Sequence, residues 1–207
     1  MATMFETTEV RWFWSNDDGR TERVRSWMLG TVAREAGLHQ AAPQMRTDLY
    51  LVPCSPLLGV KQRGGGVLEL KLRISSGRLP PIGAVSGRLE QWGKVQASDV
   101  ESLGVPIGCG WASVGKRRWL VRLDAATSRP LSPEVVPEAG CGVELTELVD
   151  RDQVTLGFEA FAPDAAARRR ALDVALRRMA QEMPELVLGE AESRGYPEWL
   201  ANVRARP

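Results

Sequence analysis

The chain has 207 residues, which suits one domain or one domain with a helical appendage, and its apolar fraction of 43% is ordinary for a globular core. Its 27 Lys and Arg residues nearly balance 26 Asp and Glu residues, which disfavours a general nucleic-acid binder, since such proteins are clearly basic. No apolar run approaches the length of a membrane span, and the N-terminus lacks the shape of a signal peptide. We therefore expect a cytoplasmic protein with neither nucleic acid nor a membrane as its partner.

The cysteines and the histidine limit the possible chemistry. Cys54, Cys109 and Cys141 are an odd set without CxxC spacing, which indicates reduced thiols rather than a disulfide framework. His39 is the single histidine, so most zinc sites and most His-dependent catalytic triads are excluded.

Two strands and a helix are predicted in the N-terminal quarter of the chain. Residues 5–14 and 45–52 alternate between polar and apolar side chains, which is the pattern of strands with one buried face. Between them, a helix is expected to start with Thr21 as its N-cap and to run to about residue 36, where Gly37 ends it. The polar faces of the two strands carry Thr7, Glu9 and Arg11, and Arg46, Asp48 and Tyr50.

Residues 58–74 have the pattern of a β-hairpin. The three glycines at 64–66 supply the tight reversal, because a two-residue hairpin turn requires positive φ angles. One face of the hairpin is apolar, and the other is a row of mostly positive charge, formed by Lys61, Arg63, Glu69, Lys71 and Arg73. The proline-containing stretch 75–83 is expected to be a loop.

Four more strands are predicted, over residues 85–95, 111–123, 142–149 and 153–161. The polar face of the second carries Lys116, Arg118 and Arg122. Residues 97–110 are expected to be irregular, and the proline-rich stretch 124–140 is expected to be a surface loop.

Helices are expected to complete the chain. Residues from about 164 to 182 have an apolar stripe at helical spacing, and the arginine run 168–170 is expected to form its solvated face. The segment SRGYPEWL, residues 193–200, predicts a short helix that docks through Tyr196, Trp199 and Leu200.

Several strands share one pattern, apolar on one face and charged on the other. An open sheet would place such charges in water, but these faces are enriched in Arg and Lys, and the helices come at the ends of the strand series. We therefore predict an α+β fold: a closed antiparallel β-barrel with a polar tunnel and a few helices packed outside. A single domain, 1–207, is expected, with C-terminal helices at about 164–203 packing on the barrel.

A tunnel lined with cations needs a partner for its charge. Withdrawing one charge from water costs on the order of several kcal/mol, so the interior must be wet, contain matched acids or bind an anion. A polyphosphate fits, because Arg and Lys form charge-assisted bonds to its oxygens. Glu residues among the cations would then hold Mg²⁺ or Mn²⁺, which prefer oxygen ligands and would polarise the phosphoryl group.

The order of these motifs resembles that of CYTH-domain proteins of the triphosphate tunnel metalloenzyme superfamily. Their Glu-x-Glu-x-Lys motif on the first strand is matched by Thr7-Thr8-Glu9-Val10-Arg11, and their Asp-x-Tyr strand by Asp48 and Tyr50. The basic hairpin of the family is matched by Lys61, Arg63 and Lys71, and its later basic strand by Lys116 and Arg118. Its closing acidic strand is matched by Glu159, and its final Ser/Tyr/Leu segment by SRGYPEWL.

The resemblance implies a Mg²⁺- or Mn²⁺-dependent hydrolase whose small-molecule substrate is inorganic or organic triphosphate. Glu9 and Glu159 would be catalytic, and metal would be held by Glu9, Glu69, Glu144 and Glu159. Phosphate would be bound by Arg11, Lys61, Arg63, Lys71, Arg73, Lys116, Arg118 and Arg122. The organic part of a substrate and the oligomeric state are left open.

Two departures from the family pattern leave an alternative open. Thr7 stands where the first glutamate belongs, and Phe161 stands where a second closing acid is expected. Glu144 or Glu147 would compensate, but alternation puts them on opposite faces, so at most one of them points inward. The chain is therefore either a divergent hydrolase or a non-catalytic barrel that binds a phosphorylated or otherwise anionic small ligand. A barrel that merely holds water is a third possibility.

Overall fold

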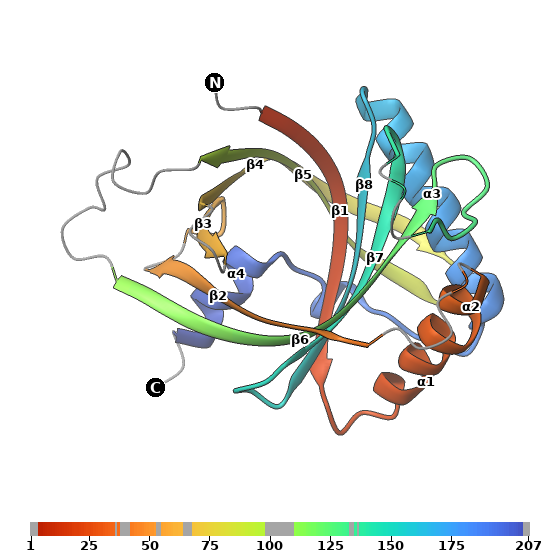
Figure 1. Cartoon of the computed structure of the whole chain (residues 1–207), viewed down its shortest axis with the longest axis horizontal. Coiled ribbons are helices and arrows are strands. Elements are labelled where there is room, and N and C mark those ends of the chain that lie inside the picture. The colour runs from red at the N-terminus through yellow and green to blue at the C-terminus, as the bar shows by residue number, and fades with distance from the viewer. Residues whose placement is uncertain are drawn as a thin grey trace.

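The computed structural model describes residues 4–35, 37, 42–52, 55–63, 68–97, 110–132, 135 and 137–204. Within this part of the chain, eight antiparallel strands close a barrel in the order β1, β5, β4, β3, β2, β6, β7 and β8, with β8 pairing back onto β1 (Figure 1). The strands are β1 Met4–Ser15, β2 Gln44–Val52, β3 Leu58–Arg63, β4 Leu68–Ile82, β5 Val85–Ala97, β6 Gly110–Asp124, β7 Gly140–Leu148 and β8 Gln153–Phe161. The predicted closed antiparallel barrel is confirmed.

Some predictions fall outside the described residues. They concern the glycines 64–66 of the hairpin, residues 98–109 of the irregular stretch, His39, Cys54 and Cys109.

One helical segment lies between β1 and β2, and the other helices follow the last strand. Helix α1, Arg20–Trp27, continues through a π-helical turn, Met28–Val32, into α2, Ala33–Glu35. Helices α3, Ala165–Glu182, and α4, Tyr196–Arg204, follow the last strand, with a 3-10 turn at Glu190–Glu192 between them. In the ranges that the structure describes, no helix is both long and apolar enough to cross a membrane.

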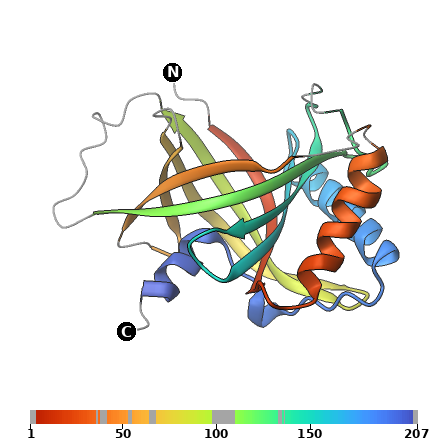
Figure 2. The same ribbon diagram turned by 60° about the horizontal axis from the view of Figure 1, so that its bottom comes forward.

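The apolar face of the barrel points outward, as predicted. Helices α1, α2 and α3 lie along the same side of the barrel (Figures 1 and 2). They bury a core that includes Trp12, Leu145 and Phe158 of the strands, packed with Met28 and Leu172 of the helices, all at most 1% exposed. Each fully buried side chain of this size stabilises the fold by roughly 1.5–3 kcal/mol. Because alternate residues point to opposite faces, this outer core directs the charged positions into the barrel.

Helix α4 covers one end of the barrel interior. Trp199 stacks on Phe13 with ring centroids 5.4 Å apart and 6° between planes, and Tyr196 meets Phe13 edge-to-face. Phe13 lies on the same face of β1 as Glu9 and Arg11, which points into the barrel. The cluster of Phe13, Tyr196 and Trp199 therefore closes the barrel interior at the α4 end, next to the charged residues. The predicted docking of the C-terminal segment through Tyr196, Trp199 and Leu200 is confirmed.

Two local predictions were wrong. Thr21 does not cap α1; the helix begins after Gly19, and the Thr21 hydroxyl instead accepts a hydrogen bond from Trp14 Nε1 at 2.9 Å. Residues 75–83 are not a loop, because β4 continues to Ile82 and pairs with β5. The prolines lie where the register shifts between Leu79 and Ile82, so their missing N–H groups cost no ladder hydrogen bond there.

The arginine run on α3 is not uniformly solvated. Arg168 is only 4% exposed, donates to the Ala162 carbonyl at 3.2 Å and forms an ion pair with Glu6 of β1. The prediction that the arginine run is solvated is therefore wrong for Arg168, because its side chain is buried where α3 contacts β1.

Candidate functional site

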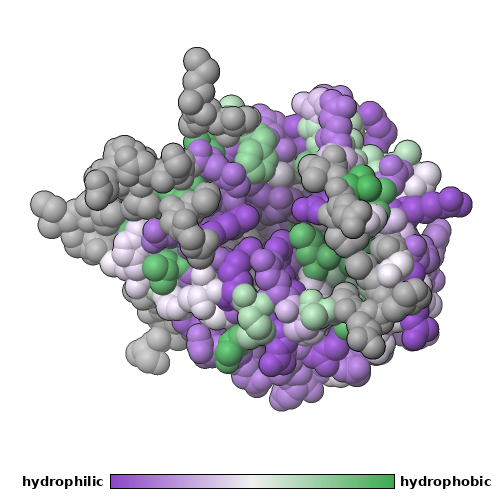
Figure 3. Space-filling model, in the orientation of Figure 1, coloured by the Kyte–Doolittle hydropathy of each residue, from purple (hydrophilic) through white to green (hydrophobic). Residues whose placement is uncertain are grey.

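The barrel encloses a cavity of about 850 Å³. Figure 3 shows it as a hollow bordered mainly by hydrophilic side chains. Of the described residues that line it, ten are Lys or Arg and six are Glu, so the wall carries excess positive charge. The cations are Arg11, Arg46, Lys61, Arg63, Lys71, Lys94, Lys116, Arg118, Arg122 and Arg168, and the acids are Glu6, Glu9, Glu69, Glu138, Glu144 and Glu159.

The residues proposed from the sequence converge on this cavity, except for Arg73. The Arg73 guanidinium lies 2.7 Å from Glu90 and 3.4 Å from Glu198 of α4, at the end of the barrel that α4 covers. Lys94 lines the cavity but was not proposed as a site residue. Its alternation with Glu90 and Trp92 on β5 is the signal that identifies it as inward-facing.

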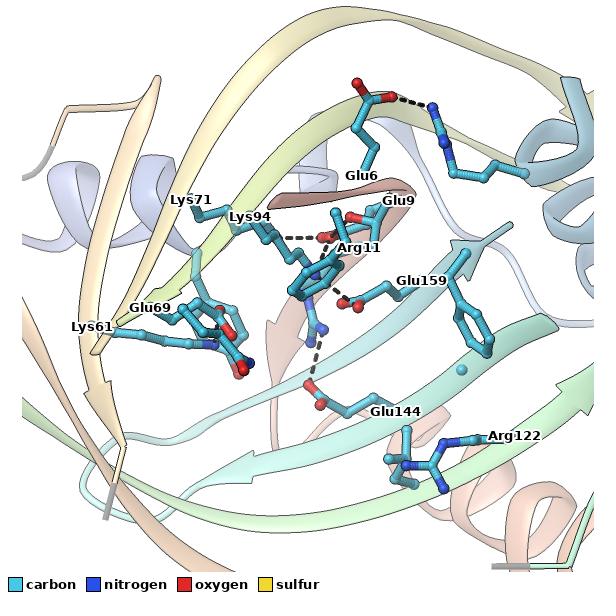
Figure 4. A pocket seen from close by; sticks show the side chains of 18 of the residues that line it. Glu6, Glu9, Arg11, Lys61, Glu69, Lys71, Lys94, Arg122, Glu144 and Glu159 are labelled. Atoms are coloured by element: carbon cyan, nitrogen blue, oxygen red, sulfur yellow. Dashed lines mark hydrogen bonds and ion pairs between the residues drawn. The ribbon is translucent and has the colours of Figure 1, made fainter. Parts of the chain in front are cut away.

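Lys94 joins the two acids expected to be catalytic. Its ammonium group lies 2.8 Å from Glu9 and 2.7 Å from Glu159, and Figure 4 shows the three side chains as one group. The pairing reflects register, since Glu9 of β1 stands directly opposite Glu159 of β8. Burial alone would lower the pKa of Lys94, but Glu159 and Glu9 raise it above its ordinary value. The two carboxylates thus hold a permanent cation between them.

Glu9 is the most heavily bonded acid of the wall. It also accepts a hydrogen bond from Lys71. The hydroxyl of Thr7, which stands where the CYTH motif would have a glutamate, donates to Glu9 at 2.7 Å. Burial opposes ionisation, but Lys71 and Lys94 lower the pKa of Glu9 far below its ordinary range. Glu9 is therefore ionised at any physiological pH.

The hairpin supplies a second group of charges. Glu69 lies 2.7 Å from both Lys61 and Arg63. Burial raises the pKa of Glu69, but these two cations lower it more strongly, to about 2. The charged face of the hairpin, predicted from the sequence, therefore lines the cavity, and in it the Glu69 carboxylate lies between the cations of Lys61 and Arg63.

Glu144 holds two arginines on the opposite wall, 2.9 Å from Arg11 and 2.5 Å from Arg118. Glu147 lies outside the barrel, where it pairs with Arg25 and Arg117, so the structure places Glu144 and not Glu147 in the cavity. Arg11 lies flat over Gly157, its partner across β1 and β8.

Gly157 makes this position of Arg11 possible. A Cβ at Gly157 would come 2.5 Å from Arg11 Cζ, so only glycine leaves room for the guanidinium.

A buried lysine lies near the end covered by α4. Lys116 Nζ donates to Asp48 at 2.8 Å and to the Tyr50 hydroxyl at 2.7 Å, and it lies 4.0 Å from the centre of the Tyr196 ring. Burial lowers the pKa of Lys116 to about 7, although Asp48 acts in the opposite direction. This group therefore gains or loses its proton near neutral pH.

No family model matches this chain, and no curated protein matches it in sequence. The resemblance to CYTH-domain proteins stays a prediction. What the site can do is therefore argued from its own residues.

The carboxylates do not fit a divalent metal ion as they are arranged. In the part of the chain that the structure describes, no three Asp, Glu, His or Cys side chains group closely enough to hold one. Each of the four acids proposed as metal ligands is bonded to at least one cation, and Glu9 and Glu159 share Lys94. The wall is suited to hold an anion, because its cations are numerous, buried and fixed in position by their acids.

Proposed function

We propose that the cavity binds a triphosphate or a related small polyanion. The observation that carries this proposal is the excess of ten Lys and Arg over six Glu among the described lining residues. Phosphate oxygens accept charge-assisted hydrogen bonds from both side chains, and the planar guanidinium groups can bind two oxygens at once.

The paired acids support this proposal because they position the cations. Arg11 and Arg118 converge on Glu144, while Lys61 and Arg63 converge on Glu69. Long side chains lose conformational freedom when they bind, and cations that are already held in place lose less. A polyanion that enters the cavity meets ordered donors on opposite walls.

Binding without a divalent metal ion follows from Lys94. Together with Lys71, which also pairs with Glu9, its ammonium group balances the charges of Glu9 and Glu159, so a phosphate that approaches them does not need a metal ion to screen their charge. We accordingly expect polyphosphate binding to persist in the presence of a chelator.

Ligand-induced stabilisation tests this function. In buffer with EDTA, tripolyphosphate at 100 times its dissociation constant should raise the free energy of unfolding by roughly 2.7 kcal/mol. Sulfate at matched ionic strength controls for general salt effects. An unchanged unfolding transition at every tripolyphosphate concentration would instead favour a barrel that only holds water.

Metal-dependent triphosphate hydrolysis is the second candidate. It requires Glu9 and Glu159 to release Lys94 before they could hold a metal ion, and the observation that favours hydrolysis is a group able to transfer a proton, Lys116. A buried lysine with a pKa of about 7, bonded to the Tyr50 hydroxyl, is a group that can exchange a proton at neutral pH. Phosphate release from tripolyphosphate with Mg²⁺ or Mn²⁺ decides between the candidates. Release that is abolished in Glu9→Gln supports a hydrolase, whereas tight binding without release supports the non-catalytic barrel.

A further inference from the structure

All the lysines of the chain line the cavity. The sequence contains four, Lys61, Lys71, Lys94 and Lys116, and each of them belongs to the cavity wall. The other 23 of the 27 Lys and Arg residues are arginines. A guanidinium group keeps its proton in proteins, whereas a lysine amine can lose its proton and then act as a nucleophile. Nucleophilic side-chain amines are therefore confined to the cavity.

Two of these lysines are poorly placed to react with a ligand. Lys94 stays charged, because burial lowers its pKa but the two carboxylates that it joins raise it above the ordinary value. Lys116 is only 3% exposed, and Asp48, Tyr50 and Tyr196 surround its ammonium group at the end covered by α4. Neither nitrogen is therefore available to the carbon atom of a ligand in the cavity.

Lys71 is more accessible, but its surroundings favour the charged form. Its side chain is 17% exposed, forms an ion pair with Glu9 and lies over the Trp92 ring, with Nζ 4.6 Å from the ring centre. Burial lowers the pKa of Lys71, whereas Glu9 and Glu159 act in the opposite direction. The aromatic face also attracts an ammonium group rather than a neutral amine.

Lys61 combines access to the cavity with cationic surroundings. Its side chain is 18% exposed, and Figure 4 shows it extending towards Glu69. Among the described residues, Glu69 is its only carboxylate partner, and Glu69 is shared with Arg63. Burial lowers the pKa of Lys61, Glu69 opposes this change, and the positive charges of Arg63 and Lys94 lower the pKa further. Lys61 is therefore the cavity amine that can both lose its proton and be reached by a ligand.

A guanidinium group for a phosphate lies beside Lys61. Arg63 follows Lys61 on the same inward face of β3, about 7 Å further along the strand, and its side chain is 37% exposed. A small ligand with a phosphate a few bonds away from a carbonyl group can thus place the phosphate on Arg63 and the carbonyl carbon at Lys61 Nζ. Phosphate recognition by arginine uses charge-assisted hydrogen bonds, which fix the ligand in position.

We propose that Lys61 forms a reversible imine with a small aldehyde that carries a phosphate group. The lone pair of Nζ adds to the carbonyl carbon, and a C–N bond forms. Both protons of the neutral amine pass to the carbonyl oxygen, which leaves as water when the C=N bond forms, so the step needs no oxidant or reductant. A proton from the solvent then makes the imine cationic, and Glu69 pairs with it. This inference rests on the proposed binding of polyanions in the same cavity.

The test uses pyridoxal phosphate as the probe, because sodium borohydride reduces its imine to a permanent link that peptide mapping by mass spectrometry can locate. In the unmodified protein, Lys61 should carry at least about ten times more label than each of the other three lysines, which is the effect of one pKa unit on the neutral fraction of an amine. Pyridoxal, which lacks the phosphate, should give at least about tenfold less label, since it loses the charge-assisted bonds to Arg63. An excess of tripolyphosphate should prevent labelling.

A substitution at the same position gives a second test. Lys61→Arg keeps the positive charge and removes the nucleophile, so labelling should be lost without appearing at another lysine. Urea denaturation shows whether this variant is folded. If it is not folded, the peptide map of the unmodified protein decides.

The outcomes separate this inference from the function on which it rests. Label that is spread evenly over the lysines, centred on a lysine other than Lys61, equal with pyridoxal or undiminished by tripolyphosphate contradicts the inference. If tripolyphosphate binds in isothermal titration but no lysine is labelled, the imine is wrong while polyanion binding stands. If tripolyphosphate does not bind and no lysine is labelled, both proposals fail.

Discussion

The Lys94 ammonium group lies 2.8 Å from Glu9, between that carboxylate and Glu159. Lys94 is only 4% exposed and Glu9 only 6%. Two carboxylates placed directly opposite each other on neighbouring strands would repel, and this lysine turns the repulsion into an ion-pair triad. Lys71 also pairs with Glu9, so the two lysines together balance both carboxylates in this part of the wall.

Removing the cation of this triad is expected to destabilise the fold. Lys94→Met should lower the free energy of unfolding by about 3 kcal/mol, because it leaves Glu9 buried with Lys71 as its remaining cation. Urea denaturation measures the change. Arg117→Met is the control, since Arg117 is half exposed and faces outward, and a loss below about 1 kcal/mol is expected for it. Equal losses in the two variants would show that the triad does not stabilise the barrel.

A methyl group at Gly157 should act on Arg11 rather than on the backbone. In Gly157→Ala the new Cβ displaces the guanidinium, which swings away from Glu144. We expect tripolyphosphate affinity to fall about tenfold, and stability to fall by about 1–2 kcal/mol from the crowding. Gly77→Ala is the matched control, because nothing lies within 4 Å of a Cβ there. Unchanged affinity in Gly157→Ala would remove Arg11 from the binding site.

The pKa of Lys116 predicts how stability depends on pH. This lysine releases its proton at about pH 7 in the folded protein and near 10.5 in the unfolded chain. Between these values the unfolded chain binds more protons, so the contribution of Lys116 to stability rises with pH and is lost as the pH falls towards 7.

Comparing Lys116→Met with the unmodified protein isolates this contribution. The difference in unfolding free energy between the two proteins should change steadily from pH 7 to 9.5, in the direction of a relatively more stable unmodified protein at high pH. Tripolyphosphate affinity should also strengthen below pH 7, where Lys116 is charged. A difference that is independent of pH would mean that Lys116 keeps its proton throughout.

The aromatic contact between α4 and the barrel is expected to hold the closed end together. Trp199→Ala should cost about 3–5 kcal/mol, because the side chain is 2% exposed, stacks on Phe13 and donates to Gln153 at 2.8 Å. Val187→Ala, at a residue 61% exposed, should change stability by less than about 0.5 kcal/mol. If Trp199→Ala were equally mild, α4 would be an appendage rather than part of the barrel.

The barrel strands could be predicted because the alternation of polar and apolar residues is a local property of the sequence. The charged face of the hairpin, with Lys61, Glu69 and Lys71, lines the cavity as the sequence indicated. The closure of the barrel could also be predicted from the two-faced pattern of the strands, since their apolar faces must be buried and the helices bury them from outside. A strand pattern does not show how far along the barrel a residue lies, and for that reason Arg73 was placed in the cavity although it belongs to the end covered by α4.

The ion pairs between side chains far apart in the sequence could not be predicted from the sequence. The register of β1 on β8 decides that Glu9 meets Glu159, and the position of β5 decides that Lys94 lies between them. The burial of Arg168 likewise depends on where α3 meets Glu6.

The central claim, that the cations inside the barrel bind a polyphosphate, is tested most directly by two neighbouring arginines of β6. Arg118 lines the cavity and Arg117 faces outward, so Arg118→Gln and Arg117→Gln remove the same charge from opposite faces of one strand. Isothermal titration with tripolyphosphate in EDTA should show at least about a tenfold loss of affinity for Arg118→Gln, the removal of one charge-assisted bond, and a change below about twofold for Arg117→Gln. Equal effects of the two substitutions, or no binding to the unmodified protein, would contradict the claim.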